Sequence, residues 1–228
     1  MFALALGILV ATQLLLPGII ENRLVEGLRR SFGDVKIIRA EVSAYPAYQM
    51  LSGKIDSVNL DLRRVAFGDL VVDAVLLDGR NIKLDMGRLV AGEGVRVTDA
   101  DLLRGTFVIA EDDLNEYFWK RFNQSRFFRV ALDRGRAVLT GNMNVLGRDL
   151  AVRVAGEFRV GGGTTVAFVP REVKVENTTV PPLFLDLIAK EWAVSLELDQ
   201  EAIPMIVEDL LVEDGQLFIY GRRPAAGS

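Results

Sequence analysis

An α+β fold with a long, meandering antiparallel sheet is predicted by three features of the 228-residue chain. Most of the chain after position 34 reads as strands in which apolar and polar residues alternate, the period of a half-buried strand. Helical segments interrupt these strands at only three places. Strands and helices therefore do not alternate regularly, which argues against a parallel doubly wound sheet. Half of the residues are hydrophobic, so a chain of this length can bury a sizeable core.

The first element is an apolar amino-terminal segment, residues 1–16, and the first charged residue is Glu21. As a helix the segment spans about 24 Å at about 1.5 Å per residue, which is shorter than the ~30 Å hydrocarbon core of a bilayer. Three interpretations stay open: a signal-peptide hydrophobic region, a short membrane anchor, and a buried core helix. No Lys or Arg precedes the segment, which departs from the usual signal-peptide pattern.

Beyond Pro17 and Gly18 the sequence predicts an amphipathic helix that ends near Gly33. Its apolar residues recur at every fourth position, which places them on one helical face. This stripe consists of Leu16, Ile20, Leu24, Leu28 and Phe32. Charged residues fill the other side, where Glu26 and Arg30 have the i, i+4 spacing of a helical ion pair. The stripe is expected to pack against a broad apolar surface such as a sheet, a lipid or a membrane.

The next part of the chain predicts strands joined by tight turns. Alternation within 58–62 shifts by one position at 63–64, which predicts a β-bulge. Glycine-containing pairs predict the turns. The turns are expected at Gly68-Asp69 and Asp78-Gly79, and the strands at 58–67, 70–77 and 82–86.

The second half of the chain continues with strands and two further short helices. Apolar residues occupy the even positions of 150–160, the clearest strand pattern, and the glycine triplet at 161–163 predicts a turn after it. Acidic residues begin a helix expected at 111–123, as the helix dipole favours. Two prolines begin the other helix, expected at 181–192. Further strands are expected at 166–169, 173–175, 194–198 and 217–220.

One domain is expected, because no Gly/Ser-rich or Pro-rich linker divides the chain. We place it at 17–221, preceded by the signal or anchor segment 1–16 and followed by a loose tail, 222–228.

Composition excludes several classes of function. The chain has no Cys and no His, which excludes thiol nucleophiles, Cys/His zinc sites and triads that use histidine as the base. The net charge of −4 argues against a nucleic-acid partner, because no basic excess is present to neutralise phosphates. Phosphate-loop and nucleophile-elbow motifs do not occur in the sequence. We therefore expect no catalytic residue, no metal and no cofactor.

Two acidic patterns are candidates for cation binding, since carboxylate oxygens suit calcium and magnesium. Asp99 and Asp101 form one, and the run at 111–113 forms the other. No loop of calcium-binding spacing follows either pattern. We therefore favour a turn at Asp99 and Asp101 and a helix start at 111–113. A hydrolase that uses two carboxylates is a further functional hypothesis, which we rank below the two non-enzymatic functions described below.

A crowd of aromatic residues is the chain's more informative feature. It consists of Phe107, Tyr117, Phe118, Trp119, Phe122, Phe127 and Phe128. They are explained either by core packing or by the wall of an apolar cavity or a membrane-touching rim. At about 100° per residue, Trp119 turns away from the face that Phe118 and Phe122 share. Basic residues that could meet lipid phosphates are interleaved there: Lys120, Arg121, Arg126 and Arg129.

Lipid-contacting residues are expected on the amphipathic helix and in the aromatic crowd. The candidates are Leu24, Leu28, Phe32, Phe107, Tyr117, Phe118, Trp119 and Phe122.

Four stretches of the chain carry a family resemblance. They are LLLPGIIENRLVEGLRRSFG at 14–33, AYPAYQMLSGKIDSVNLDL at 44–62, GDLVVDAVLLDGRNIKLDMGRLV at 68–90 and ADLLRGTFVIAEDDLNEYF at 100–118. In these stretches the chain resembles the LmeA-like family of bacterial extracytoplasmic proteins. The motifs are turns and strand patterns and contain no catalytic signature.

The resemblance implies a tubular lipid-binding (TULIP-like) fold. In that fold a long curled antiparallel sheet wraps around the amphipathic amino-terminal helix, with an apolar groove between them and two further short helices. The family is linked to phospholipid binding and to maintenance of the cell envelope. We expect a non-enzymatic, membrane-tethered protein that binds or transfers phospholipid or another acyl-chain lipid. The alternative is a structural or interaction protein of the envelope without a ligand.

Location is expected at the extracytoplasmic face of the bacterial cell membrane, or outside the cell if 1–16 is cleaved. Three arginines after the apolar segment would favour a cytoplasmic body by the positive-inside rule: Arg23, Arg29 and Arg30. The resemblance favours the extracytoplasmic side, and we follow it.

Overall fold

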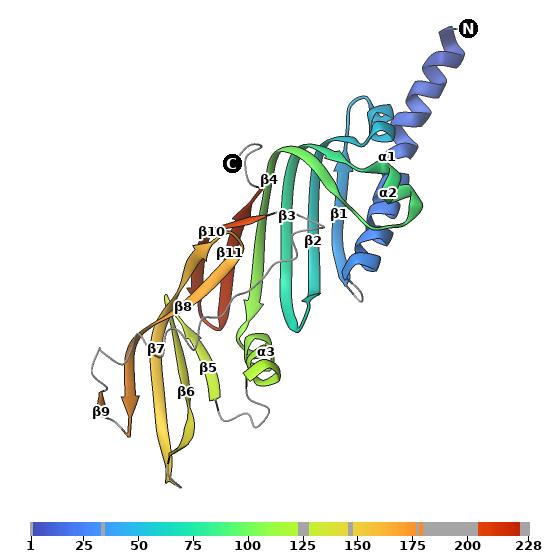
Figure 1. Ribbon diagram of the computed structural model, residues 1–228. Helices are drawn as coiled ribbons and strands as arrows, with labels where there is room; N and C mark the ends of the chain where they lie inside the picture. Colours follow the sequence, from blue (N-terminus) through green and yellow to red (C-terminus); the bar gives the residue numbers. More distant parts are fainter. Residues whose placement is uncertain are drawn as a thin grey trace.

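Two antiparallel sheets and a long amino-terminal helix make up the computed structural model (Figure 1). The structure describes residues 2–32, 35–122, 128–145, 148–176, 178–179 and 205–223. Within these ranges it describes only the backbone at 2–11, 31–32, 37–38, 121–122, 143–145 and 148.

Helix α1 (Phe2–Phe32) is a continuous helix of 31 residues. The apolar segment and the amphipathic helix, expected as two elements, are parts of this one helix, which runs through Pro17. Its carboxyl end at Phe32 agrees with the expected end near Gly33. In Figure 1 its amino-terminal part extends beyond the rest of the molecule.

The first sheet has six strands and holds most of the chain before position 110. Its strand order is β1-β2-β3-β4-β11-β10. A short 3-10 helix, η1 (Ala47–Ser52), joins β1 to β2, and helix α2 (Met86–Ala91) joins β3 to β4. The strands are β1 (Lys36–Ser43), β2 (Lys54–Phe67), β3 (Leu70–Leu84), β4 (Val97–Ala110), β10 (Ile206–Glu213) and β11 (Gln216–Arg222).

The second sheet has five strands in the order of the chain, β5 to β9. Helix α3 (Glu111–Phe122) leads from β4 into it. The strands are β5 (Phe128–Asp133), β6 (Arg136–Val145), β7 (Arg148–Gly162), β8 (Thr165–Val175) and β9 (Thr178–Thr179). The expected helix at 111–123 and the expected strands at 150–160 and 217–220 are confirmed in α3, β7 and β11.

The two sheets are joined through β10. The backbone N–H of Gly135, in the β5–β6 turn, donates to the Val212 carbonyl at 2.8 Å, and that of Gly215 donates to the Leu132 carbonyl at 3.1 Å. A third backbone bond ties the start of β10 to the turn between β7 and β8. The second sheet therefore continues the molecule away from α1, as Figure 1 shows.

The α+β class is confirmed, and the strands divide into two sheets rather than one long sheet. In the described residues neither sheet closes on itself. Helix α1 lies beside β1, the edge strand of the first sheet, where it also contacts η1, α2 and β2.

The turn expected at Asp78-Gly79 is wrong, because both residues lie inside β3. A side chain at this position would crowd two neighbouring side chains. A Cβ at Gly79 would lie 2.3 Å from the Ile82 Cδ1 atom and 3.0 Å from the Val58 Cγ1 atom. A glycine inside a strand can mark such a close approach as well as a turn. The turn at Gly68-Asp69 is confirmed between β2 and β3.

The bulge expected at 63–64 is also wrong. Arg63 pairs with Ala74 and Val65 with Val72, so no residue is inserted between them. Arg64 instead adopts a φ of 59°, and the buried positions change from even to odd numbers there. The strand expected at 82–86 ends at Leu84, because the Asp85 side chain accepts the Arg88 N–H and caps α2.

One contiguous hydrophobic core runs from α1 through the first sheet and into the second. Its most buried large side chains include Leu28, Met50, Leu62, Ile109, Leu114, Leu217 and Ile219. The helix expected at 181–192, the strand expected at 194–198 and Phe127 lie outside the described residues.

Candidate functional site

The candidate residues on α1 face the core. Leu24 and Leu28 are buried, together with Ile20 of the same stripe, and belong to the core that includes β2 and β3. Phe32 ends the helix, and its side chain is not among those described. The i, i+4 pattern therefore identified the face of the helix that meets the sheet.

Polar side chains of α1 hold it against the sheet edge. The Glu21 Oε1 atom accepts the backbone N–H of Val42 in edge strand β1 at 3.0 Å. A Cβ at Gly27 would lie 3.0 Å from the Val95 Cγ2 atom, so the helix passes close to the segment after α2. Arg30 donates to the Gly92 carbonyl at 2.9 Å, at the carboxyl end of α2. The Glu21 contact covers part of edge strand β1, whose unpaired backbone would otherwise be open to other chains.

The candidates around α3 form a second group, against β3, β4 and β5. Phe107 and Tyr117 are buried, and Phe118 packs half-buried against the core. Edge-to-face ring contacts link Phe107 to Phe67, with centroids 6.1 Å apart, and Tyr117 to Phe118, at 6.0 Å. Such pairs add to the stabilisation from burial alone. The side chain of Phe122 is not among those described.

Trp119 holds α3 to the second sheet. Its side chain is half-buried, and the indole N–H donates to the Phe128 carbonyl at 2.5 Å. The polar edge of the ring is therefore directed at β5. This contact favours the packing interpretation for Trp119 over the membrane-touching rim.

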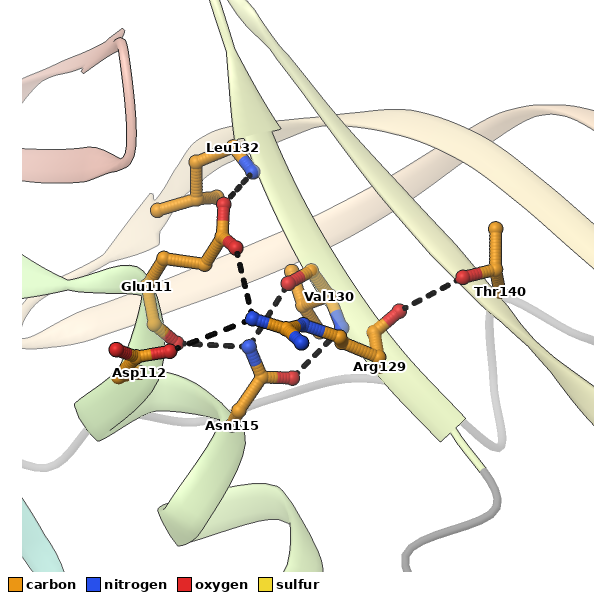
Figure 2. A network of polar contacts seen from close by, with 7 residues as sticks. All are labelled: Glu111, Asp112, Asn115, Arg129, Val130, Leu132 and Thr140. Carbon is orange, nitrogen blue, oxygen red and sulfur yellow. Dashed lines mark hydrogen bonds and ion pairs between the residues drawn. The ribbon is translucent and has the colours of Figure 1, made fainter.

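A buried asparagine forms the centre of the contact between α3 and β5 (Figure 2). The Asn115 Nδ2 atom donates to the carbonyls of Glu111, at 2.9 Å, and Val130, at 2.8 Å. The Asn115 Oδ1 atom accepts the Val130 N–H at 2.7 Å. One turn earlier, the Glu111 carboxylate accepts the Leu132 N–H at 2.8 Å. Side chains of α3 thus bond to the β5 backbone much as a neighbouring strand would.

The charges near this contact are paired with one another. Arg129 lies 3.7 Å from a carboxylate oxygen of Glu111 and 3.5 Å from one of Asp112. Arg64 forms a 2.6 Å ion pair with Asp113. Of the basic residues expected to meet lipid phosphates, Arg129 is engaged with α3 and Lys120 is exposed. Arg126 and the side chain of Arg121 lie outside the described residues.

Acidic residues have structural roles here. The run at 111–113 forms the first turn of α3, as expected. Asp99 and Asp101 lie in β4 rather than in the expected turn, and the Asp101 carboxylate accepts the Asn81 side-chain amide at 2.7 Å. Among the described residues no group of three or more acidic side chains is placed to hold a metal ion.

The candidate lipid-contacting residues therefore form two groups in the same hydrophobic core. Leu24 and Leu28 lie near the β1 edge, and the aromatic residues lie where β4 leads into α3. Both groups belong to the same contiguous core, with Phe118 at its border. What the structure provides in its described part is an apolar interior that both groups border.

Residue reasoning missed Asn115 and Gln13, which join elements distant in sequence. For Gln13 the signal is a single amide within an apolar helical stretch, and for Asn115 it is an amide that directly follows Leu114 on the apolar side of the expected helix. Gln13 accepts the Ala47 N–H at 2.8 Å and donates to the Ala44 carbonyl at 3.2 Å, so the apolar part of α1 is attached to the segment around η1.

In the described part of the chain, where α1 side chains begin at Thr12, no helix is long and apolar enough to cross a membrane.

Comparison with known proteins identifies the family. Neither the curated proteins nor the solved structures gave a match. The family model described as LmeA-like phospholipid-binding matches residues 11–222, which includes both sheets and all but the start of α1. The chain therefore belongs to the LmeA-like phospholipid-binding family.

Proposed function

We propose that this protein binds phospholipid, or another lipid with acyl chains, without catalysing a reaction. The observation that carries the proposal is the apolar interior shared by α1 and the first sheet, in a chain of a phospholipid-binding family. Apolar side chains lie on the sheet-facing side of α1 and on β2, β3, β4 and β11. Such a surface suits acyl chains, which gain about 0.8 kcal/mol for each CH₂ removed from water.

The lipid is proposed to lie between α1 and the inner face of the first sheet, in a tubular lipid-binding arrangement. A long helix beside a twisted antiparallel sheet supports this reading. Leu24, Leu28 and Phe107 are each in contact with other core side chains. An acyl chain is therefore proposed to enter when α1, or a polypeptide segment packed against α1, moves away from the sheet.

The amino-terminal segment 1–16 is proposed to tether the body to the extracytoplasmic face of the bacterial cell membrane. Support comes from the absence of charge before Glu21 and from the exposure of Leu14 and Leu15. The extracytoplasmic side is supported by the family resemblance. Transfer of lipid between membranes is a further step that binding would permit.

The test is lipid identification on the full chain. The protein is purified in a mild detergent, exchanged into a volatile buffer and analysed by native mass spectrometry and organic extraction. We expect a bound phospholipid that survives removal of free lipid by gel filtration. A detergent-solubilised membrane protein of similar size, purified in parallel, controls for carry-over. Repeated absence of lipid from folded protein would contradict the proposal.

A ligand-free structural role in the envelope is the second candidate. It is favoured by close packing in the described part of the core, where Met50, Val72 and Leu217 have no exposed surface. A lipid-free chain that remains folded and binds no added phospholipid would establish this alternative.

A further inference from the structure

Exposed apolar side chains are concentrated at one end of the molecule. Among the described residues, six of the ten large hydrophobic side chains with high exposure come from α1 and the segment around η1. We call this group the collar. It consists of Leu14, Leu15, Ile19, Tyr45, Tyr48 and Leu51. Tyr45 is 79% exposed, Leu14 74% and Leu51 63%. Single exposed apolar residues are ordinary, but a contiguous group marks an interaction surface.

The two parts of the collar are fixed to each other. Helix α1 contacts η1. The Gln13 side chain bonds to Ala44 and Ala47, one residue before and one residue after the Tyr45–Pro46 pair. The Asp56 carboxylate accepts the Tyr45 N–H at 2.6 Å, which secures the base of the loop. The η1 part of the collar is therefore held beside the α1 part.

The outward face of α1 changes abruptly from apolar to polar. Leu15, Ile19, Asn22 and Glu26 follow one another at the spacings that keep residues on one helical face, and all four are exposed. The first two are apolar and the last two are polar, so the change occurs within one turn. The η1 segment lies on the apolar side of this boundary, because Gln13 contacts it while Glu21 contacts β1 further along.

We infer that the collar is the surface on which the folded body sits against a lipid bilayer. In this inference the Ile19–Asn22 boundary lies at the level of the headgroups. Tyr45 and Tyr48 have the amphipathic rings that favour this zone, and Leu51 inserts beside them. The amino-terminal part of α1 continues from the collar away from the sheets, without a charged residue (Figure 1). The inference rests on the proposed membrane tether and adds that the body docks as well.

The absence of cysteine from the chain makes single reporters possible. Leu51→Cys in the full-length protein is labelled with the environment-sensitive dye NBD and mixed with vesicles of phosphatidylcholine and phosphatidylglycerol. Val160→Cys, an exposed apolar position on β7 of the second sheet, is the matched control. A second collar reporter, Tyr48→Cys, guards against a local effect of one label. Circular dichroism checks that each labelled variant is folded.

We expect NBD at positions 51 and 48 to shift to shorter wavelength and to be quenched at least about twofold by lipids spin-labelled near the headgroup, with no change at position 160. If the protein floats with vesicles but the collar reporters stay in water, the tether stands and the collar inference is overturned. Protein that fails to float contradicts both. A shift that grows with protein concentration in buffer without vesicles would assign the collar to a second copy of the chain and would also overturn the inference.

Discussion

Replacing Asn115 tests how helix α3 is held to strand β5 of the second sheet. Asn115→Ala removes the partners of the Val130 N–H and carbonyl, both of which face the Asn115 amide. Each buried backbone group left without a partner costs about 1–3 kcal/mol, so the variant should lose about 2–6 kcal/mol of unfolding free energy. The assay is urea unfolding of the full chain in detergent, followed by circular dichroism. The midpoint is expected to fall by on the order of 1 M.

Two further variants sharpen this test. Lys120→Ala removes an exposed side chain from the same helix and should change stability by less than about 0.5 kcal/mol. Asn115→Asp keeps an acceptor for the Val130 N–H but places a carboxylate against the Val130 carbonyl. It should be less stable near pH 7 than near pH 4, where the acid can donate a proton to that carbonyl. An Asn115→Ala midpoint equal to that of Lys120→Ala would refute the reasoning.

Three other outcomes follow from the described contacts. Leu28→Asp buries an unpaired carboxylate and should unfold the body or cost several kcal/mol of stability, measured by thermal melting. Its control, Arg29→Asp on the exposed side of α1, should cost about 0–1 kcal/mol. Equal tolerance of both variants would mean that α1 is not packed against the sheet. The pKa of Glu157 lies below its ordinary 4.5 chiefly because Arg171 hydrogen-bonds to it. The contact between Glu157 and Arg171 therefore stabilises the fold at pH values above the unfolded-state pKa, and this stabilisation is lost as the pH falls through the lower folded-state pKa. Arg171→Gln should raise this pKa in an NMR titration, and an unchanged value would contradict the assignment. Deleting residues 1–11 leaves the contacts between α1 and the η1 segment in place and should yield a folded body; aggregation would show that these residues belong to the core.

Local periodicity predicted the elements whose burial is one-sided. The even-numbered apolar residues of 150–160 became β7, whose Val154 and Phe158 are buried. The i, i+4 stripe of α1 became the face that packs on the sheet. These predictions succeeded because each pattern depends only on which side of one element meets the core.

Predictions that depended on a partner element failed. Gly79 looks like a turn residue, and only the positions of Val58 and Ile82 show that it fills a tight place within a strand. The two sheets are joined by backbone bonds between segments more than seventy residues apart, such as the bond from the Gly135 N–H to the Val212 carbonyl. Turn chemistry and alternation carry no information on which strands become neighbours.

For the candidate site, the sequence predicted which residues are apolar and buried but not the bonds that position them. Leu24, Leu28, Phe107 and Tyr117 are buried, as apolar residues on one face should be. The bonds that position them come from Glu21 and Asn115, whose roles appear only once α1 lies beside β1 and α3 beside β5. Both cover backbone groups of edge strands with side chains of a helix, which residue spacing does not reveal.

Photo-crosslinking with a phospholipid that carries a diazirine in its acyl chain tests the central claim most directly. The full chain is incubated with this lipid, irradiated, digested and mapped by mass spectrometry. We expect adducts on the sheet-facing stripe of α1 around Leu24 and Leu28 and on β4 around Phe107, reduced by an excess of unlabelled phospholipid. Adducts confined to the polar outer face of the first sheet, around Asn59 and Asp61 of β2, or no adducts on folded protein, would contradict lipid binding between α1 and the sheet.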